Sequence, residues 1–165
     1  MAFYTPQPLA DLHTLDEFDS GEPSLDDWLR RRARANQASG ASRTFVTCND
    51  ERVIGYYALA SGAVATAEAT GRFRRNMPEP IPVAVLARLA IDRRYQKQGI
   101  GRALIRDGTA RVLSAAEVIG IRGIVVHAIS EDAKAFYTAF GFNQSPLDPM
   151  MLMIALADLR SGLAA

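Results

Sequence analysis

The segment that most constrains this chain is residues 93–104, which follows an apolar run and opens an amphipathic helical pattern. Its Gln96-x-x-Gly99-x-Gly101 spacing puts two residues without a Cβ atom at a strand-to-helix turn. Glycines there let the backbone approach a ligand closely, and the start of the helix presents free N–H groups and a partial positive charge. The sequence therefore predicts a turn that binds a pyrophosphate group.

Other phosphate-binding patterns do not fit this segment. A dinucleotide-binding turn needs G-x-G-x-x-G and a P-loop needs G-x-x-x-x-G-K-[ST], and neither pattern occurs in the sequence. Two glycines near a helix start are also common in ordinary strand-to-helix turns. Taken alone, the spacing leaves a purely structural role open.

The composition favours one soluble domain. The 165 residues, of which 48% are hydrophobic, are enough for one core, so we expect a single domain over residues 1–165. No leader or membrane-spanning run is visible, which predicts a cytoplasmic protein. Cys48 is the only cysteine and is accompanied by only two histidines, so we expect no disulfide and no metal site.

The positive charges are unevenly distributed, although the net charge is only +1. Three clusters stand out: Arg30, Arg31, Arg32 and Arg34; Arg72, Arg74 and Arg75; Arg93, Arg94, Lys97 and Arg102. A phosphate-rich ligand would suit this distribution. The alternative for each cluster is a solvated helix face or loop.

The order of predicted elements indicates an α/β fold with a mixed sheet. In the first half we expect a strand at 8–15, then a helix capped by Ser24 and stopped at Gly40, and an antiparallel hairpin of strands 43–48 and 52–60. In the helix, Trp28 is interpreted as a core anchor in preference to the alternative, a residue that stacks on a ligand. A basic, proline-punctuated loop over 71–82 then precedes a buried strand at 83–91.

In the second half we expect a helix at 100–116 that crosses over to a parallel strand at 121–129. A helix at 131–140 follows and ends at Gly141, before a strand at 150–156 and a small terminal helix or tail at 157–163. Cys48 is interpreted as a small buried residue without a chemical role, and His127 as a histidine packed inward.

The Gln96–Gly101 spacing resembles the acetyl-CoA motif of the GNAT superfamily of N-acetyltransferases. The resemblance implies the GNAT acyltransferase fold: a mixed, mostly antiparallel central sheet, flanked by helices, whose central strands splay apart around the pantetheine arm. It also implies acetyl-CoA as co-substrate, without a metal. The residues expected to bind acetyl-CoA are Leu89, Ala90, Ile91, Gln96, Lys97, Gln98, Gly99, Ile100, Gly101 and Arg102.

Residues 135–142, Ala-Phe-Tyr-Thr-Ala-Phe-Gly-Phe, match the GNAT segment that places a tyrosine beside the thioester sulfur. Acetyl transfer requires a neutral amine, an oxyanion donor and a proton for the departing thiolate. Tyr137 can donate that proton, because a phenol of pKa ~10 is protonated at neutral pH. A backbone N–H at 89–91 is the expected oxyanion donor. The alternative for Tyr137 is a residue of an amphipathic helix whose hydroxyl lies at the surface.

The resemblance narrows to the GNAT toxins of bacterial type II toxin–antitoxin systems. Its motifs are Leu-Asp-Asp-Trp-Leu at 25–29, Gly-Ala-Ser-Arg-Thr-Phe-Val at 40–46, Gly-Tyr-Tyr-Ala-Leu at 55–59, Gly-Arg-Phe-Arg-Arg-Asn-Met-Pro at 71–78 and Leu-Ala-Arg-Leu-Ala at 86–90. Ser-Glu-Asp at 130–132 departs from the asparagine that many GNAT proteins carry there.

This resemblance implies acetylation of the α-amino group of aminoacyl-tRNA, which blocks translation. It also implies a homodimer, a ribbon-helix-helix antitoxin, and binding of operator DNA only through the toxin–antitoxin complex. The tRNA backbone, or an acidic antitoxin tail, would be held by Arg30, Arg34, Arg72, Arg74 and Arg75.

Two alternatives remain open. A GNAT enzyme could acetylate a small-molecule amine or a protein N-terminus, in which case the arginines would serve solubility alone. An acyl-CoA-binding or regulatory protein without turnover is the non-enzyme alternative, but the retention of Tyr137, Gln96, Gly99 and Gly101 argues against it.

Overall fold

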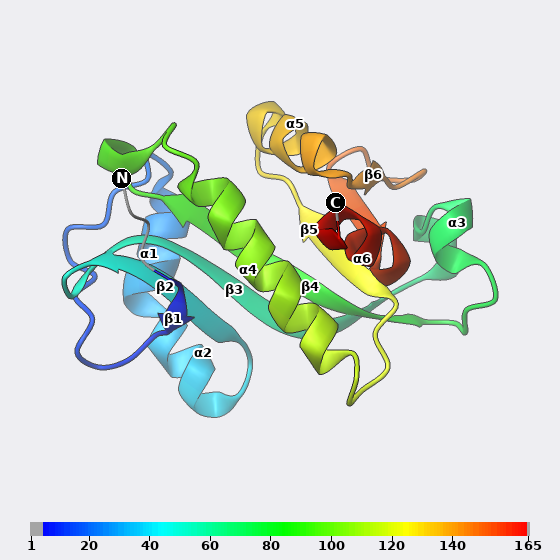
Figure 1. The fold of residues 1–165 in the computed structure, drawn as a ribbon, viewed down its shortest axis with the longest axis horizontal. Coiled ribbons are helices and arrows are strands. Elements are labelled where there is room, and N and C mark those ends of the chain that lie inside the picture. The colour runs from blue at the N-terminus through cyan, green and yellow to red at the C-terminus, as the bar shows by residue number, and fades with distance from the viewer. Residues whose placement is uncertain (1–4, 165) are drawn as a thin grey trace. The chain divides into compact units, whose positions relative to one another are not determined.

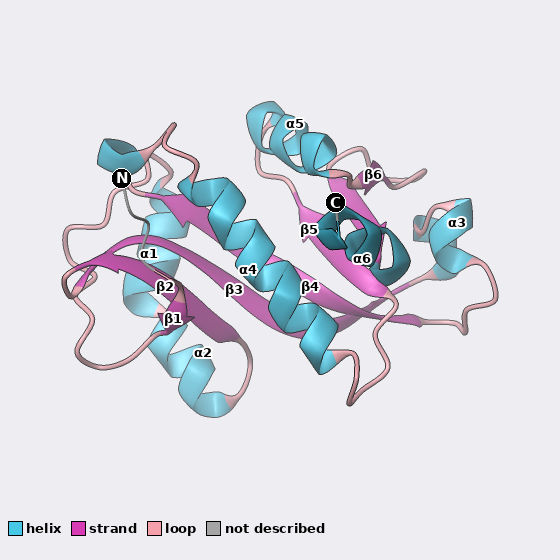
Figure 2. Cartoon of the chain, in the orientation of Figure 1, coloured by secondary structure: helices cyan, strands magenta, loops and turns pink. Residues whose placement is uncertain are grey.

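The computed structural model describes residues 5–164, which form a mixed α/β structure (Figures 1 and 2). The strands are β1 (Gln7–Pro8), β2 (Arg43–Asn49), β3 (Arg52–Val64), β4 (Ile81–Ile91), β5 (Gly123–His127), β6 (Asn143–Gln144) and β7 (Met151–Ala155). The helices are α1 (Pro23–Arg31), α2 (Ala33–Ser39), α3 (Gly71–Arg74), α4 (Ile100–Ala115), α5 (Glu131–Phe140) and α6 (Leu156–Ala164). Two 3₁₀ turns, η1 (Thr66–Glu68) and η2 (Arg93–Tyr95), complete the set.

The seven strands pair in the order β1-β2-β3-β4-β5-β7-β6. The pairs β1–β2, β2–β3, β5–β7 and β6–β7 are antiparallel, whereas β4 and β5 run parallel with Ala84 opposite Ile124. The connection from β4 to β5 contains α4, as the strand–helix–strand pattern predicts. The predicted mixed, mostly antiparallel sheet is therefore confirmed.

The chain divides into two compact units. The elements β3, β4 and α4 each have residues in both units. The first unit contains residues 5–60 and 87–108 of the described chain. One face of its sheet packs on α1 and α2 through a cluster that includes Leu29, Val46 and Tyr56. Tyr57 and Leu104 belong to a second cluster, which attaches the start of α4. Because successive side chains of a strand point to opposite faces of the sheet, the same strands contribute residues to both clusters.

The second unit contains residues 61–86 and 109–164. Its core joins Phe73, Ile81, Val125 and Met153. Gly123 begins β5 where a Cβ atom would lie 2.1 Å from the Ile154 carbonyl oxygen, so backbone packing excludes any larger residue. In the described part of the chain, every helix is too short or too polar to span a membrane.

The N-terminal region differs from the sequence prediction. Of the predicted strand at 8–15 only its beginning forms, because the chain then turns at Ala10–His13, where the His13 ring accepts the Ala10 N–H at 2.9 Å. The predicted single helix is two helices, since the backbone breaks at Arg32 (φ −121°, ψ −30°). Glu22, and not Ser24, is the N-cap, because Pro23 takes the first helical position.

Some other local features follow the sequence prediction and some depart from it. The hairpin and the stop at Gly40, whose φ is +84°, are confirmed. Within the predicted loop at 71–82, residues 71–74 instead form α3, whose N-cap Thr70 accepts the Phe73 N–H. The prediction of an inward-packed His127 is wrong, because this residue ends β5 with its side chain exposed. Trp28 packs against the first unit's core while remaining half-buried.

Candidate functional site

The predicted cofactor turn begins at Asp92, a fully buried carboxylate that caps η2. It accepts hydrogen bonds from the backbone N–H groups of Asp19 at 3.1 Å and Arg94 at 3.0 Å. The Arg94 guanidinium also contacts it at 3.0 Å. Burial acts to raise the pKa of Asp92, but the Arg94 and Asp19 hydrogen bonds outweigh this effect and lower it. The ionised carboxylate therefore connects the turn to the loop before α1.

The Gln96 side chain forms hydrogen bonds that hold the turn in place. Its amide nitrogen donates to the carbonyl oxygens of Ser20 at 2.9 Å and Ile91 at 2.8 Å. Ser20 is in turn fixed by the buried carboxylate of Asp26, which accepts its hydroxyl at 2.6 Å. Gln96 thus connects the end of β4 to the loop before α1, a structural role that the spacing did not reveal.

The backbone between Gln96 and α4 is exposed and turns sharply. Lys97 (φ +64°) and Gly99 (φ +85°) are left-handed. Gly101 lies in the first turn of α4, where the N–H groups have no partner within the helix. A turn of this kind followed by a helix N-terminus fits a pyrophosphate group.

All ten predicted cofactor-binding residues lie in the first unit, on two stretches of chain joined by η2. Within 89–91, Ala90 is buried toward α1, while Leu89 and Ile91 pack on the α4 side. Within 96–102, Ile100 is buried, Gly101 is half-buried, and the remaining residues are exposed: Gln96, Lys97, Gln98, Gly99 and Arg102.

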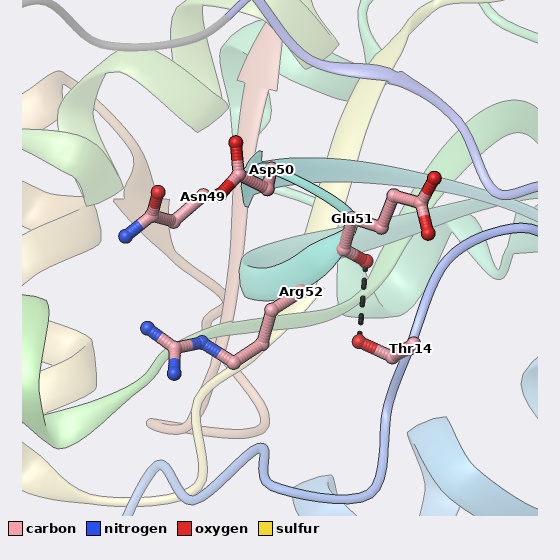
Figure 3. A pocket seen from close by; sticks show the side chains of 5 residues that line it. All are labelled: Thr14, Asn49, Asp50, Glu51 and Arg52. Carbon is pink, nitrogen blue, oxygen red and sulfur yellow. Dashed lines mark hydrogen bonds between the residues drawn. The ribbon is translucent and has the colours of Figure 1, made fainter.

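Tyr95 is a positioning residue that the sequence analysis missed. Its hydroxyl accepts hydrogen bonds from Asn49 Nδ2 at 3.0 Å and Arg52 Nη2 at 2.9 Å. Both partners line a hollow of about 310 Å³ at the β2–β3 turn, with Thr14, Asp50 and Glu51 (Figure 3). The hairpin end therefore supports the residue just before Gln96. The only sequence signal was the adjacency of Tyr95 to the glycine motif.

The predicted catalytic residue, Tyr137, lies on α5 in the second unit. Its ring is 7% exposed and makes edge-on contacts with Phe136 and Phe142, at centroid distances of 5.3 and 5.6 Å. Its hydroxyl has no hydrogen-bond partner among residues 5–164. Burial raises the pKa of Tyr137 well above its ordinary value, so the phenol is protonated throughout the physiological range. Most of this side chain is therefore buried, so Tyr137 does not occupy an ordinary exposed position on the helix.

Helix α5 is well defined at both ends. Ser130 caps it by accepting the Ala133 N–H at 3.1 Å, and the backbone turns out of the helix at Gly141, whose φ is +121°. The Phe142 N–H then donates to the Tyr137 carbonyl oxygen at 3.1 Å. These contacts fix the position of the tyrosine on the helix.

The predicted tRNA-binding arginines have different environments. Arg30 donates to the Phe18 carbonyl oxygen at 2.7 Å, and Arg34 to that of His13 at 2.5 Å, so both help to hold α1 and α2. Arg72 forms a bidentate ion pair with Asp158, with contacts of 2.6 and 3.0 Å. Arg74 and Arg75 are exposed and pair with no described carboxylate, so they are available to an external anion.

Cys48, which the sequence analysis interprets as a residue without a chemical role, is buried, as predicted. Burial raises the pKa of its thiol to about 11, which leaves almost no thiolate at neutral pH. Within residues 5–164, no three His, Cys, Asp or Glu side chains are grouped in a way that could hold a metal ion.

The chain is similar to several known proteins. Residues 40–144 match the family model described as an acetyltransferase (GNAT) domain. The chain is 53% identical over 159 residues to a tRNA-acetylating toxin of Mycobacterium tuberculosis (strain ATCC 25618 / H37Rv), with 96% of each chain covered.

Two solved structures are also similar. The first is AtaT complexed with acetyl-methionyl-tRNAfMet, with a TM-score of 0.89, 28% identity, and coverage of 98% of this chain and 99% of that chain. The second is a tyrosine-to-phenylalanine mutant of the toxin AtaT bound to the C-terminus of the antitoxin AtaR and to acetyl-CoA. It has a TM-score of 0.83, 28% identity and 98% coverage of both chains.

Proposed function

Because the chain belongs to the acetyltransferase (GNAT) family, we propose that it transfers acetyl from acetyl-CoA to the α-amino group of aminoacyl-tRNA and so blocks translation. The observation that carries the chemistry is the turn at 96–101, where left-handed Lys97 and Gly99 lead directly into α4. The 53% identity to a tRNA-acetylating toxin supports the substrate class.

The turn supplies binding and orientation. Its backbone N–H groups and the N-terminus of α4 hold the pyrophosphate of acetyl-CoA, while Gln96 and Asp92 maintain its shape. When bound, acetyl-CoA supplies the activated acyl group. A backbone N–H of residues 89–91 stabilises the negative charge that develops on the acetyl oxygen.

Tyr137 donates the proton that the departing thiolate needs. Its buried, protonated phenol with an unpartnered hydroxyl suits a general acid. The acceptor is the α-amino group, whose ordinary pKa of roughly 7.7–8.0 leaves it partly neutral at physiological pH. A strong enzymatic base is therefore unnecessary, and water takes the proton that the nitrogen loses as the C–N bond forms and the C–S bond breaks.

The partners of this function follow from its relatives. The complex of AtaT with the C-terminus of AtaR supports a cognate antitoxin that neutralises this protein. We further propose that the antitoxin is of the ribbon-helix-helix type, that the toxin is a homodimer, and that the complex binds operator DNA. Exposed Arg74 and Arg75 contact the tRNA backbone or an acidic antitoxin segment. The site of action is the cytoplasm, where charged tRNA is used.

The test is acetylation of a pool of charged tRNAs by the purified protein with radiolabelled acetyl-CoA. Label on aminoacyl-tRNA that falls 10²- to 10⁴-fold with Tyr137→Phe, a range expected for loss of a general acid, would support the function and its catalytic residue. Label on small amines or protein N-termini, but not on charged tRNA, would replace this substrate class. Equal rates for parent and Tyr137→Phe would exclude Tyr137 as the acid.

A further inference from the structure

Arg88 is the only charged residue in the eleven-residue strand β4, and it lies on an aromatic stack. Its guanidinium carbon is 5.2 Å from the centre of the Trp28 ring. Trp28 in turn stacks on Tyr56, with centroids 6.0 Å apart and planes 8° from parallel. Tyr56 is fully buried and donates its hydroxyl to the Leu25 carbonyl oxygen at 2.7 Å. The core therefore fixes the plane on which Arg88 lies.

Most of the hydrogen-bonding capacity of Arg88 is unused. A guanidinium has five N–H donors, and within the described chain Arg88 makes one hydrogen bond, from Nη1 to the Ala87 carbonyl oxygen at 3.0 Å. It forms no ion pair with a described carboxylate. Asp26 also lies near Tyr56, but its oxygens accept hydrogen bonds from Ser20.

Arg88 is half-buried, so its unused N–H groups can bind either water or the phosphate of a ligand. Contact with the indole face stabilises the charge. Trp28 is also only half-buried, so the stack remains accessible. A flat aromatic surface beside a cation with four unused donors fits a nucleobase and its phosphate.

The position along β4 indicates which nucleotide this is. Arg88 directly precedes Leu89, the first of the residues expected to contact the acetyl group, and their Cα atoms are about 3.8 Å apart. Because successive strand residues point to opposite faces, Arg88 lies on the α1 face, which it shares with Ala90. The acceptor amine must approach the acetyl group, and in charged tRNA it is esterified to the terminal ribose.

We propose that Trp28 and Arg88 form the subsite for the 3′-terminal nucleotide of charged tRNA, with a base stacked on their planes and a phosphate bonded to Arg88. This inference rests on the proposed function and adds a substrate-positioning subsite to it. The subsite reads the single-stranded end shared by all tRNAs. It therefore fixes the ester-linked amino acid without selecting a particular tRNA.

The fluorescence of Trp28 provides a direct binding test, because this is the only tryptophan in the chain. The probe is the uncharged trinucleotide CCA, titrated into parent, Arg88→Gln and Arg106→Gln. Arg106→Gln is the matched control, since it removes one exposed positive charge from α4 in the same unit. Prior saturation with desulfo-CoA prevents the trinucleotide's adenine from occupying the cofactor turn.

We expect saturable quenching in parent and Arg106→Gln, and binding weaker by about tenfold in Arg88→Gln, as for loss of roughly 1.4 kcal/mol of stacking and ionic contact. Arg88→Lys should bind the trinucleotide almost as weakly as Arg88→Gln, because an ammonium group cannot extend the planar stack. The absence of quenching in parent, or equal affinity in parent and Arg88→Gln, would overturn the subsite.

Kinetics separate this inference from the proposed function. With charged tRNA, Arg88→Gln should raise KM about tenfold while the KM for acetyl-CoA stays unchanged. Trp28→Phe keeps an aromatic ring and should raise the KM for charged tRNA less than Trp28→Leu does. If parent binds the trinucleotide but does not acetylate charged tRNA, the proposed function fails while the nucleotide subsite stands. If parent acetylates charged tRNA, and Arg88→Gln leaves both the trinucleotide affinity and the KM for charged tRNA unchanged, only the subsite fails.

Discussion

Two tyrosines show how single residues acquire different chemistry from their surroundings. Tyr95 accepts hydrogen bonds from Asn49 and Arg52, which lower its pKa despite some desolvation. Tyr137 is packed between phenylalanine rings, and burial raises its pKa. Of these two residues, only Tyr137 has both a raised pKa, which keeps its hydroxyl protonated, and a hydroxyl without a hydrogen-bond partner among residues 5–164. At the scale of the residue, burial distinguishes the proposed proton donor from the structural anchor.

The raised pKa of Tyr137 leads to a prediction for the pH dependence of acetylation. Its acid form persists above the ordinary phenol pKa of about 10, so its ionisation should not lower kcat between pH 6 and 9.5. The rate should rise as the acceptor amine loses its proton near pH 8 and then reach a plateau. Single-turnover rates with charged tRNA, measured at half-unit pH intervals, test this.

Tyr137→Phe should lower that plateau by 10²-fold or more without moving the rising limb. A decline near pH 9 that is present in the parent and missing in Tyr137→Phe would contradict the raised pKa. Acetyl-CoA affinity, measured by calorimetry, should be equal in both proteins and serves as the control for correct folding.

At the scale of the element, the turn between β4 and α4 is stabilised mainly by groups outside the glycine motif. Asp92 and Gln96 connect it to the loop before α1, and Tyr95 connects it to the β2–β3 hairpin. The N–H groups that we propose to bind the pyrophosphate thus belong to a segment that is anchored at several points. Preorganisation of this kind favours binding because less conformational entropy is lost.

Asp92→Asn should destabilise the fold by about 2–3 kcal/mol at pH 7, because a buried carboxylate with several donors is replaced by an amide that cannot accept them all. Urea unfolding measures this difference. The folded-state pKa of Asp92 is lowered, so its stabilisation is complete above the unfolded value of about 3.9 and is lost as pH falls through the folded value.

The difference between parent and Asp92→Asn should therefore shrink below about pH 4. Asp11→Asn, at an exposed position, is the matched control and should leave the unfolding free energy unchanged at both pH values. A difference for Asp92→Asn that is the same at pH 7 and pH 3 would show that the carboxylate charge is not the cause.

Gln96→Ala tests the turn as a binding element. Loss of its bonds to Ser20 and Ile91 should loosen the turn and raise the KM for acetyl-CoA by about tenfold, with a smaller effect on kcat. Steady-state kinetics at saturating charged tRNA measure both parameters. Gln144→Ala, an exposed glutamine in β6, is the control. An unchanged KM would mean that backbone conformation alone maintains the turn.

At the scale of the whole molecule, a net charge of +1 conceals unequal availability of positive groups. Arg30, Arg34 and Arg72 hold parts of the fold together through carbonyl oxygens and the Asp158 carboxylate. Arg74 and Arg75, which follow buried Phe73, have no such partners in the described chain. Availability, and not number, decides which arginines can neutralise phosphates.

The salt dependence of tRNA use distinguishes these groups. Each phosphate contact contributes roughly 0.7–0.9 to the slope of log affinity against log salt concentration. Arg74→Ala combined with Arg75→Ala should therefore reduce the slope of log KM for charged tRNA by about 1.5. Arg72→Ala should change it little, because Asp158 already neutralises that side chain. Equal slopes in all variants would exclude both arginines from phosphate contact.

Local pattern was sufficient to predict the hairpin, the crossover helix α4, the helix that ends at Gly141 and the glycine turn. Each depends on interactions within a few residues: side-chain periodicity, helix capping and the φ > 0 conformation of Gly40 or Gly99. The predicted strand at 8–15 failed because a hydrogen bond to the His13 ring stabilises a turn there. Propensity alone does not include that contact.

By itself, the sequence determined the family, the order of the main elements and the candidates for acetyl-CoA binding and proton transfer. Only the tertiary structure decided what those side chains do: Gln96 bonds to Ser20, 76 positions away, and Arg72 to Asp158, 86 positions away. It likewise placed Arg88 on Trp28 and left His127 exposed. The physical reason is that hydrogen bonds and burial depend on distance in space, which local periodicity does not encode.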